Sequence, residues 1–112
     1  MAKKTRSLPE VTHLQFLVLG ILRPAEQAGR VIRSALASYG VRRSAPAFYQ
    51  LMSRLEAAGL VEGEYSQIVV GDQAVTERRY RITPEGERQW ERAYEFYTEV
   101  ARQASNVRWS NA

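Results

Sequence analysis

The sequence contains no cysteine and only one histidine, His13, among its 112 residues. Without cysteine the chain can form no disulfide, no thiolate nucleophile and no cysteine-ligated zinc site. A single imidazole also excludes a multi-histidine metal cluster and a pair of catalytic histidines. The sequence has no nucleophile–base set and no glycine-rich phosphate loop. We therefore expect a protein that is not an enzyme and that carries no metal or cofactor.

Long apolar runs are missing as well, since none approaches the roughly 18 residues that a membrane-spanning helix needs. The basic N-terminus is followed by polar residues and by no small-residue cleavage site, which is not the pattern of a signal peptide. These features predict a cytoplasmic protein with no membrane partner. With 45% hydrophobic and 25% charged residues, the composition is that of one globular domain.

Charge is divided unevenly along the chain. Residues 1–54 carry nine basic and two acidic side chains, a net +7, whereas residues 55–112 carry seven arginines and ten acidic side chains, a net −3. A basic half favours contact with a polyanion such as nucleic acid, and a solvated charged surface is the alternative. Residues 1–10 are predicted to form a flexible basic arm. Its Lys3, Lys4 and Arg6 either reach a minor groove or phosphates, or only increase solubility.

The first predicted helix begins after Thr12, because Thr12 and Gln15 have the spacing of a capping box. Its main apolar stripe is Leu14, Leu17, Val18, Ile21 and Leu22. Phe16 and Leu19 lie off this stripe, so the helix is apolar nearly all round. It therefore needs cover on a second side, either from the last helix or from a partner chain.

A second helix is predicted over residues 25–39, after Arg23 and Pro24 end the first one. Gly29 lies inside this prediction, and the close approach of another helix would explain it. Gly40 fits the left-handed position that follows a helix. The residues expected on the buried face of this helix are Ala28, Val31, Ile32, Ala35, Leu36 and Tyr39.

A third helix is predicted from Pro46, which suits a first helical turn, to Ala58, just before Gly59. Its expected buried stripe is Phe48, Leu51, Met52, Leu55 and Ala58. The opposite face has hydrogen-bonding groups and few charges. That face consists of Pro46, Tyr49, Gln50, Ser53 and Ala57, with Arg54 at its edge.

The second half of the chain predicts a hairpin and a long last helix. Residues 60–61 and 65–70 favour a strand, residues 71–73 a turn, and residues 75–82 a returning strand. Thr83 and Pro84 then have the pattern of a helix N-cap and first position. The apolar stripe of the last helix is Trp90, Ala93, Tyr94, Tyr97, Val100, Ala101 and Ala104, and a polar tail starts at Ser105.

This order of elements is typical of a winged helix-turn-helix, a mainly α fold with a small β-hairpin (α+β). The third helix would then read a major groove. So small a core cannot bury the aromatic stripe of the last helix. We therefore expect a homodimer in which the last helices pack against the partner's first helix. The predicted organisation is a basic arm over residues 1–10, a DNA-binding domain over residues 11–83, and a C-terminal dimerisation helix with its tail over residues 84–112.

Three stretches between about residues 14 and 90 resemble the PadR-like winged-helix transcriptional regulators. Residues 17–22 look like the first-helix motif of that family, an apolar run broken by one glycine. Residues 48–61 resemble its recognition-helix motif, Leu-Tyr-x-x-Leu-x-x-Leu-Glu-x-x-Gly-Leu-Ile. Residues 78–86 resemble its second wing strand, Tyr-Arg-Leu-Thr-x-x-Gly. The resemblance implies a DNA-binding regulator whose family tyrosine is Tyr49, and a single C-terminal helix for dimerisation.

The chain departs from the family pattern at several positions. Ala47 replaces a threonine whose hydroxyl would face phosphate, and Glu77 stands where a basic residue is common. The hairpin is also acidic, with Glu62, Glu64 and Asp72. These departures predict weaker contacts between the wing and DNA.

The residues expected to contact DNA lie in the turn before the third helix, on its outer face and in the second wing strand. In the turn and at the helix N-terminus, arginines and backbone N–H groups favour phosphate. Gln50 can pair with adenine. Arg78 and Arg79 either contact DNA or pair with acidic side chains of the hairpin. The predicted DNA-binding set is Arg42, Arg43, Ser44, Tyr49, Gln50, Ser53, Arg54, Arg78 and Arg79.

A second set of residues is expected at the dimer interface: Phe16, Leu19, Trp90, Tyr94, Tyr97 and Val100. Its aromatic members are interface core or, as the alternative, a pocket for a small aromatic effector, as the family resemblance implies. The predicted function is a homodimeric, sequence-specific DNA-binding repressor. The alternative is a winged-helix protein-interaction module that has lost DNA binding, which the acidic wing and Ala47 favour.

Overall fold

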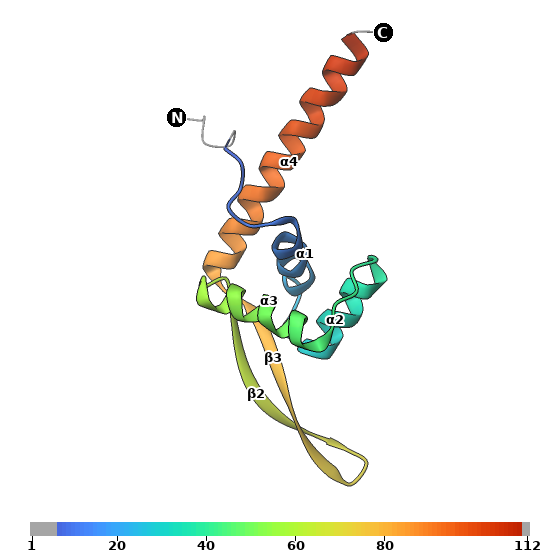
Figure 1. The fold of residues 1–112 in the computed structure, drawn as a ribbon. Helices are drawn as coiled ribbons and strands as arrows, with labels where there is room; N and C mark the ends of the chain where they lie inside the picture. The colour runs from blue at the N-terminus through green and yellow to red at the C-terminus, as the bar shows by residue number, and fades with distance from the viewer. Residues whose placement is uncertain (1–6, 111–112) are drawn as a thin grey trace.

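The computed structural model describes residues 7–110, with side chains as far as residue 105. Lys3, Lys4 and Arg6 of the predicted arm lie outside the described residues. The elements are α1 (His13–Leu22), β1 (Gln27–Ala28), α2 (Gly29–Ser38), α3 (Ala45–Ala57), β2 (Val61–Val70), β3 (Gln73–Ile82) and α4 (Pro84–Ser110) (Figure 1). Within the described residues, no helix is long and apolar enough to cross a membrane.

The three strands form one antiparallel sheet in the order β1-β3-β2. β2 and β3 pair from Val61↔Ile82 at the base to Val70↔Gln73 at the tip, where Gly71 turns with a φ of 65°. The hairpin forms the wing of a winged helix-turn-helix, and α2 and α3 form the helix-turn-helix pair. The predicted fold class is confirmed, with one strand more than the expected hairpin.

The core lies where the three short helices meet the base of the wing. Its largest fully buried side chains come from α1, α2, α3 and β3: Val18, Leu19, Leu22, Ile32, Leu36, Phe48, Met52, Leu55 and Tyr80. The second cover of α1 comes from α4, because Phe16 stacks on Trp90 with ring centroids 5.5 Å apart. The sequence analysis allows either the last helix or a partner chain to cover α1, and the last helix does so here.

Helix ends follow local chemistry closely. The capping box at Thr12 is present, with each side chain of Thr12 and Gln15 accepting from the other's backbone N–H at 3.1 Å. Gly40 follows α2 with a φ of 85°. The Thr83 hydroxyl caps α4 by accepting from the Gly86 N–H at 3.0 Å. The predicted polar tail from Ser105 is helical as far as Ser110.

The prediction of a helix from residue 25 was wrong, because α2 begins only at Gly29. Gln27 and Ala28 instead form β1 and pair with Tyr80 and Arg79 of β3. With this later start the inward face of α2 is Ile32 and Leu36.

Three residues expected in the core are exposed as a result of where helices begin and end. They are Val31 on α2, Tyr39 at the C-cap of α2 and Ala58 at the C-cap of α3.

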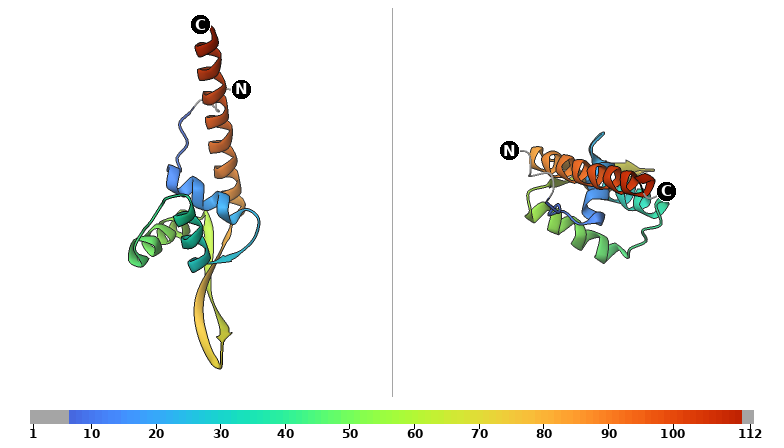
Figure 2. Two further views of the ribbon diagram at one scale, coloured as in Figure 1. Left: turned by 90° about the vertical axis from the view of Figure 1, so that its right-hand side faces the viewer. Right: turned by 90° about the horizontal axis from the view of Figure 1, so that it is seen from above.

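Two elements project from this small body (Figure 2). The radius of gyration is 17.3 Å and the extents are 64 × 31 × 23 Å, whereas a compact chain of about 100 residues has a radius near 13 Å. The wing extends to one end and α4 to the other (Figure 1). Both elements therefore keep faces that the rest of the chain does not cover.

Candidate nucleic-acid interface

The N-terminus of α3 is capped, and the helix presents one face to solvent. The Ser44 hydroxyl accepts from the Ala47 N–H at 3.2 Å, and Pro46 occupies the first turn. Every predicted member of the outer face is exposed: Tyr49, Gln50, Ser53 and Arg54, together with Pro46 and Ala57. Five of the six are uncharged, and the polar groups of Tyr49, Gln50 and Ser53 can form hydrogen bonds with base edges.

Tyr49 is positioned against α2 as well as on its own helix. Its ring contacts Phe48 edge-on, with centroids 4.9 Å apart. A methyl group at Gly29 would lie 2.9 Å from the Tyr49 hydroxyl oxygen and 3.3 Å from the ring of Tyr80. Gly29 is therefore closely approached by two tyrosine side chains, one from the helix α3, as predicted, and one from the strand β3.

The turn between α2 and α3 forms a hollow lined by four arginines. Arg33 donates from Nε and one terminal nitrogen to the Arg43 carbonyl oxygen, at 3.1 and 2.9 Å, and so fixes the turn. The hollow has a volume of about 330 Å³, and its charged lining residues are Arg30, Arg33, Arg42 and Arg43. Among the residues that the structure describes, no acidic side chain lines it. Such a concentration of guanidinium groups beside a helix N-terminus is suited to binding phosphate.

Arg42 and Arg43 are exposed and form no ion pair with any residue in the described part of the chain. Arg54, on the edge of α3, is in the same state. Arg30 and Arg33 are not in the predicted DNA-binding set, although both are exposed on α2. The signal was the spacing of Arg30 and Arg33, one helical turn apart on that helix.

The arginines of the wing are engaged within the chain. Arg78 pairs with Glu56 of α3 at 2.8 Å and lies over the ring of Tyr65, with its guanidinium carbon 4.7 Å from the centroid. Burial opposes the charge of Arg78, but the hydrogen bond and Coulomb attraction to Glu56, together with the attraction to Tyr80 and Tyr65, raise its pKa. Arg78 thus links the wing to α3 instead of pointing freely to solvent.

Arg79 pairs with Glu26 and with Glu77, each at 2.9 Å, and these two hydrogen bonds raise the pKa of Arg79. Arg81 pairs with Glu62 at 2.5 Å. Two alternatives were predicted for Arg79, contact with DNA or an ion pair with an acidic side chain of the hairpin. The ion pair is present, with Glu77. The wing therefore presents no unpaired arginine in the described residues.

The predicted interface residues gather where α1 meets α4. Trp90 stacks on Tyr94 with centroids 5.2 Å apart, and the Arg23 guanidinium lies 3.9 Å above the Trp90 ring. Tyr94 and Val100 remain 51% and 48% exposed. Leu19, by contrast, is wholly buried inside the chain. The uncovered aromatic and apolar side chains thus lie on α4.

The fold and this arrangement define a winged helix-turn-helix with an uncharged outer face on α3 and a basic turn before it. Crystal structures of PadR-family transcriptional regulators from Eggerthella lenta and Clostridium difficile share the fold, with TM-scores of 0.67 and 0.72. Their identities to this chain are 29% and 17%. The matches cover 84% and 86% of this chain, and 80% and 98% of theirs.

Bacillus subtilis PadR in complex with operator DNA also has this fold, with a TM-score of 0.57 and 19% identity. That match covers 71% of this chain and 45% of the other. The resemblance to PadR-like regulators is therefore confirmed, and the chain has their winged-helix fold. The expectation that it is not an enzyme agrees with these neighbours, which are transcription regulators. No protein-family model and no curated protein sequence matches the chain.

Proposed function

We propose that the protein is a sequence-specific DNA-binding transcriptional regulator that acts as a repressor. The observation that carries this proposal is the outer face of α3, which is exposed and uncharged except for Arg54, beside a hollow lined by four arginines. A solved structure of the same fold is bound to operator DNA. Residues 11–83 would form the reading domain and residues 84–112 the dimerisation element.

In the proposed complex the two parts of the interface have different roles. Arg42 and Arg43 contact phosphates, together with the N-terminus of α3 at Ser44. These contacts supply affinity and fix the register without reading sequence. Tyr49, Gln50, Ser53 and Arg54 then lie along a major groove, where an amide such as that of Gln50 can pair with adenine. Because Arg78 and Arg79 form ion pairs with acidic side chains, we propose that they contribute less to DNA binding than Arg42 and Arg43.

The homodimer is proposed from the uncovered part of α4. This helix has 27 residues, which corresponds to a length of about 40 Å. Its first half packs against α1 as far as Tyr97, whose ring centroid lies 6.0 Å from that of Phe16. Tyr94 and Val100 are left about half exposed. Burying this face against a second copy would place two reading helices on one duplex, on a roughly palindromic operator with half-sites about 34–36 Å apart. A small aromatic effector beside Trp90 and Tyr97 is the alternative use of the same aromatic cluster.

The second candidate function is a protein-interaction module that has lost DNA binding. The specific observation in its favour is the wing, whose three arginines are all paired with glutamates. The two candidates differ in their dependence on salt. Binding through several phosphates weakens steeply as salt is added, whereas binding to a protein surface of mixed charge does not.

The test is fluorescence anisotropy with labelled duplexes, both random and selected from a random pool by repeated binding. We expect tight binding to the selected duplexes that falls steeply between about 50 and about 200 mM salt. The variant Arg42→Ala/Arg43→Ala should bind at least about tenfold more weakly, with a salt slope reduced by about two, one for each lost phosphate contact.

The matched control is Arg88→Ala/Arg92→Ala, which removes the same charge from exposed positions of α4, on the side opposite Trp90 and Tyr97. This control should bind like the wild type. If an intact dimer by light scattering shows no salt-sensitive binding, or if both double variants lose affinity equally, the DNA proposal is refuted. The interaction module is then the better description.

A further inference from the structure

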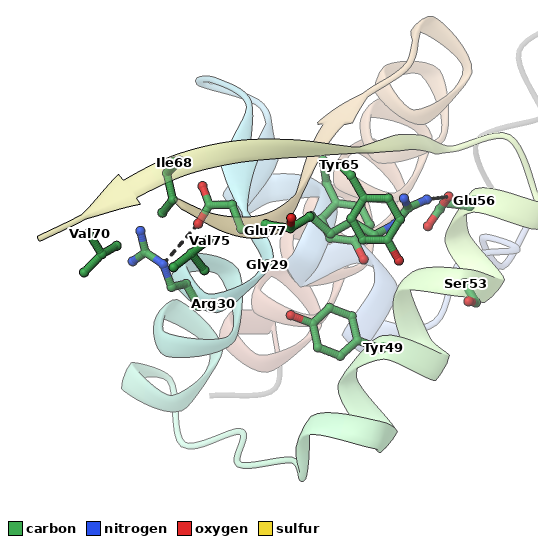
Figure 3. Close-up of a pocket in the computed structure, with 13 residues that line it drawn as sticks. Gly29, Arg30, Tyr49, Ser53, Glu56, Tyr65, Ile68, Val70, Val75 and Glu77 are labelled. Atoms are coloured by element: carbon green, nitrogen blue, oxygen red, sulfur yellow. Dashed lines mark hydrogen bonds and ion pairs between the residues drawn. The ribbon is translucent and has the colours of Figure 1, made fainter. Parts of the chain in front are cut away.

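A second and larger cavity lies between the wing and the helix-turn-helix pair (Figure 3). Its volume is about 1090 Å³, which is the size of sites that hold drug-sized molecules. Three tyrosines line it near α3, namely Tyr49, Tyr65 and Tyr80, and three aliphatic side chains line it near the wing tip. The aliphatic residues are Ile68, Val70 and Val75.

The position of this lining follows from strand pairing and twist. Ile68 faces Val75 directly across the hairpin, and Tyr65 faces Arg78 three residues nearer the base. These two pairs lie on opposite faces of a flat ribbon. A two-stranded ribbon twists strongly along its length, and the two strands cross in Figure 1. The twist brings the tyrosine end and the aliphatic end of the wing to the same cavity.

The charges in the cavity cancel in pairs. Arg78 is bonded to Glu56 at 2.8 Å and Arg30 to Glu77 at 3.3 Å, and all four residues line the cavity. A surface that holds a phosphate or a carboxylate normally offers a cation without its own acid. Among the described residues, Arg42 and Arg43 of the four-arginine hollow are such cations. This cavity is therefore unsuited to an anion and suited to an uncharged molecule.

The apolar lining is open to solvent. The exposed fractions are 69% for Tyr65, 58% for Val70, 41% for Tyr49 and 39% for Val75. The Arg78 guanidinium covers one face of the Tyr65 ring, so the other face is available for stacking. Grouped exposed apolar side chains around a concavity are the usual mark of a binding site. Stacking on an aromatic face selects a flat partner.

We propose that this cavity binds a flat, uncharged aromatic molecule, which stacks on Tyr65 and packs against Ile68 and Val75. The site is separate from the Trp90 cluster and belongs to a single chain. Tyr49 and Ser53 belong both to this cavity and to the outer face of α3. A bound molecule would therefore compete with DNA, and this competition alone rests on the proposed function.

The test uses 6-propionyl-2-(dimethylamino)naphthalene, a neutral two-ring dye whose emission changes on leaving water. We expect saturable one-to-one binding to the free protein, with NMR shift changes at Tyr65, Ile68 and Val75. The variant Val75→Asp places a carboxylate among the apolar groups and should weaken dye binding at least about tenfold. The matched control is Val69→Asp, at a position that is 75% exposed and does not line the cavity. It should bind the dye like the wild type.

Both substitutions are at exposed positions of the hairpin, and thermal unfolding by circular dichroism should confirm that both variants fold. Absence of saturable binding, equal effects of the two variants, or shift changes confined to Trp90 and its neighbours would overturn the site. A second measurement adds the dye to the protein–DNA complex and follows the release of DNA. If the dye binds but the protein has no affinity for DNA, the site stands and the proposed function fails.

Discussion

The substitution Gly86→Ala tests the joint that fixes α4 to the wing. Gly86 is buried in the first turn of α4, and the Thr83 hydroxyl that accepts from its N–H also donates to the Gly59 carbonyl at 2.6 Å. The Thr83 N–H donates to the Leu60 carbonyl at 3.1 Å. A methyl group at Gly86 would lie 2.2 Å from that Leu60 oxygen and 2.7 Å from a side-chain carbon of Ile82.

The size of the effect follows from these distances. A carbon–oxygen contact normally measures about 3.3–3.6 Å, so the methyl group is about 1 Å too close to a backbone atom that cannot rotate away. Overpacking of this kind costs about 1–3 kcal/mol, and a weakened Thr83–Leu60 hydrogen bond adds about 1 kcal/mol. The higher helix propensity of alanine offsets this loss by about 1 kcal/mol. We therefore expect Gly86→Ala to lower the free energy of unfolding by about 1–3 kcal/mol, near the upper end because the short contact is with a backbone oxygen.

The measurement is urea unfolding followed by circular dichroism. The control is Gly40→Ala, because Gly40 has a φ of 85° and no atom within 4 Å of the added methyl group. It should lose only about 1–2 kcal/mol, the cost of a left-handed conformation with a side chain. The reasoning is refuted if Gly86→Ala is as stable as the wild type, or loses no more stability than Gly40→Ala.

Two further predictions concern the ion pair and the buried tyrosine at the base of the wing. Glu56→Gln removes the partner of Arg78, whose side chain is only 23% exposed, and should lower the free energy of unfolding in urea by about 1–2 kcal/mol; an unchanged value would contradict the role given to this pair. Burial raises the pKa of Tyr80 to about 12, so the unfolded state loses its proton first and stability falls as pH rises from about 10 to about 12, by about 2 kcal/mol. The variant Tyr80→Phe should lose less stability than the wild type between about pH 10 and about pH 12, as measured by urea unfolding at several pH values. An identical dependence of the free energy of unfolding on pH in both proteins would contradict this role of Tyr80.

The elements that could be predicted from the sequence are those specified by neighbouring residues. The capping box at Thr12 and the cap at Thr83 each depend on groups three residues apart, and both are present. Gly40 and Gly71 adopt left-handed conformations where a helix end and a turn were expected. The outer face of α3 could be predicted because one helix period determines which of its residues point away from the core.

The elements that could not be predicted depend on contacts between distant parts of the chain. Residues 25–28 have a composition compatible with helix, but Gln27 and Ala28 pair with β3, some 50 residues away. The Gln27 side chain also donates to the Ile21 carbonyl at 2.7 Å, which fixes this extended segment. Val31 was assigned to the core because the helical count began at Ala28, which is not in the helix.

The partners of the wing arginines were hidden for the same reason. Glu56 lies 22 residues before Arg78, and Glu26 lies 53 residues before Arg79. The local sequence shows only that the wing contains both signs of charge. An unpaired arginine of the wing could contact DNA, whereas a paired one could not do so freely. Which of the two holds depends on the helix against which the hairpin packs.

The pairing of the wing arginines also explains how the two proposed sites can coexist on one small domain. A wing that held phosphates would need unpaired cations facing the cavity, and these would disfavour an uncharged aromatic molecule there. Here Glu56 and Glu77 neutralise the cations of the cavity, while Arg42 and Arg43, at the turn before α3, have no acidic partner among residues 7–105. Phosphate binding is thereby assigned to the turn and apolar binding to the wing. Because Tyr49 belongs both to the cavity and to the exposed outer face of α3, the aromatic molecule and DNA would exclude each other.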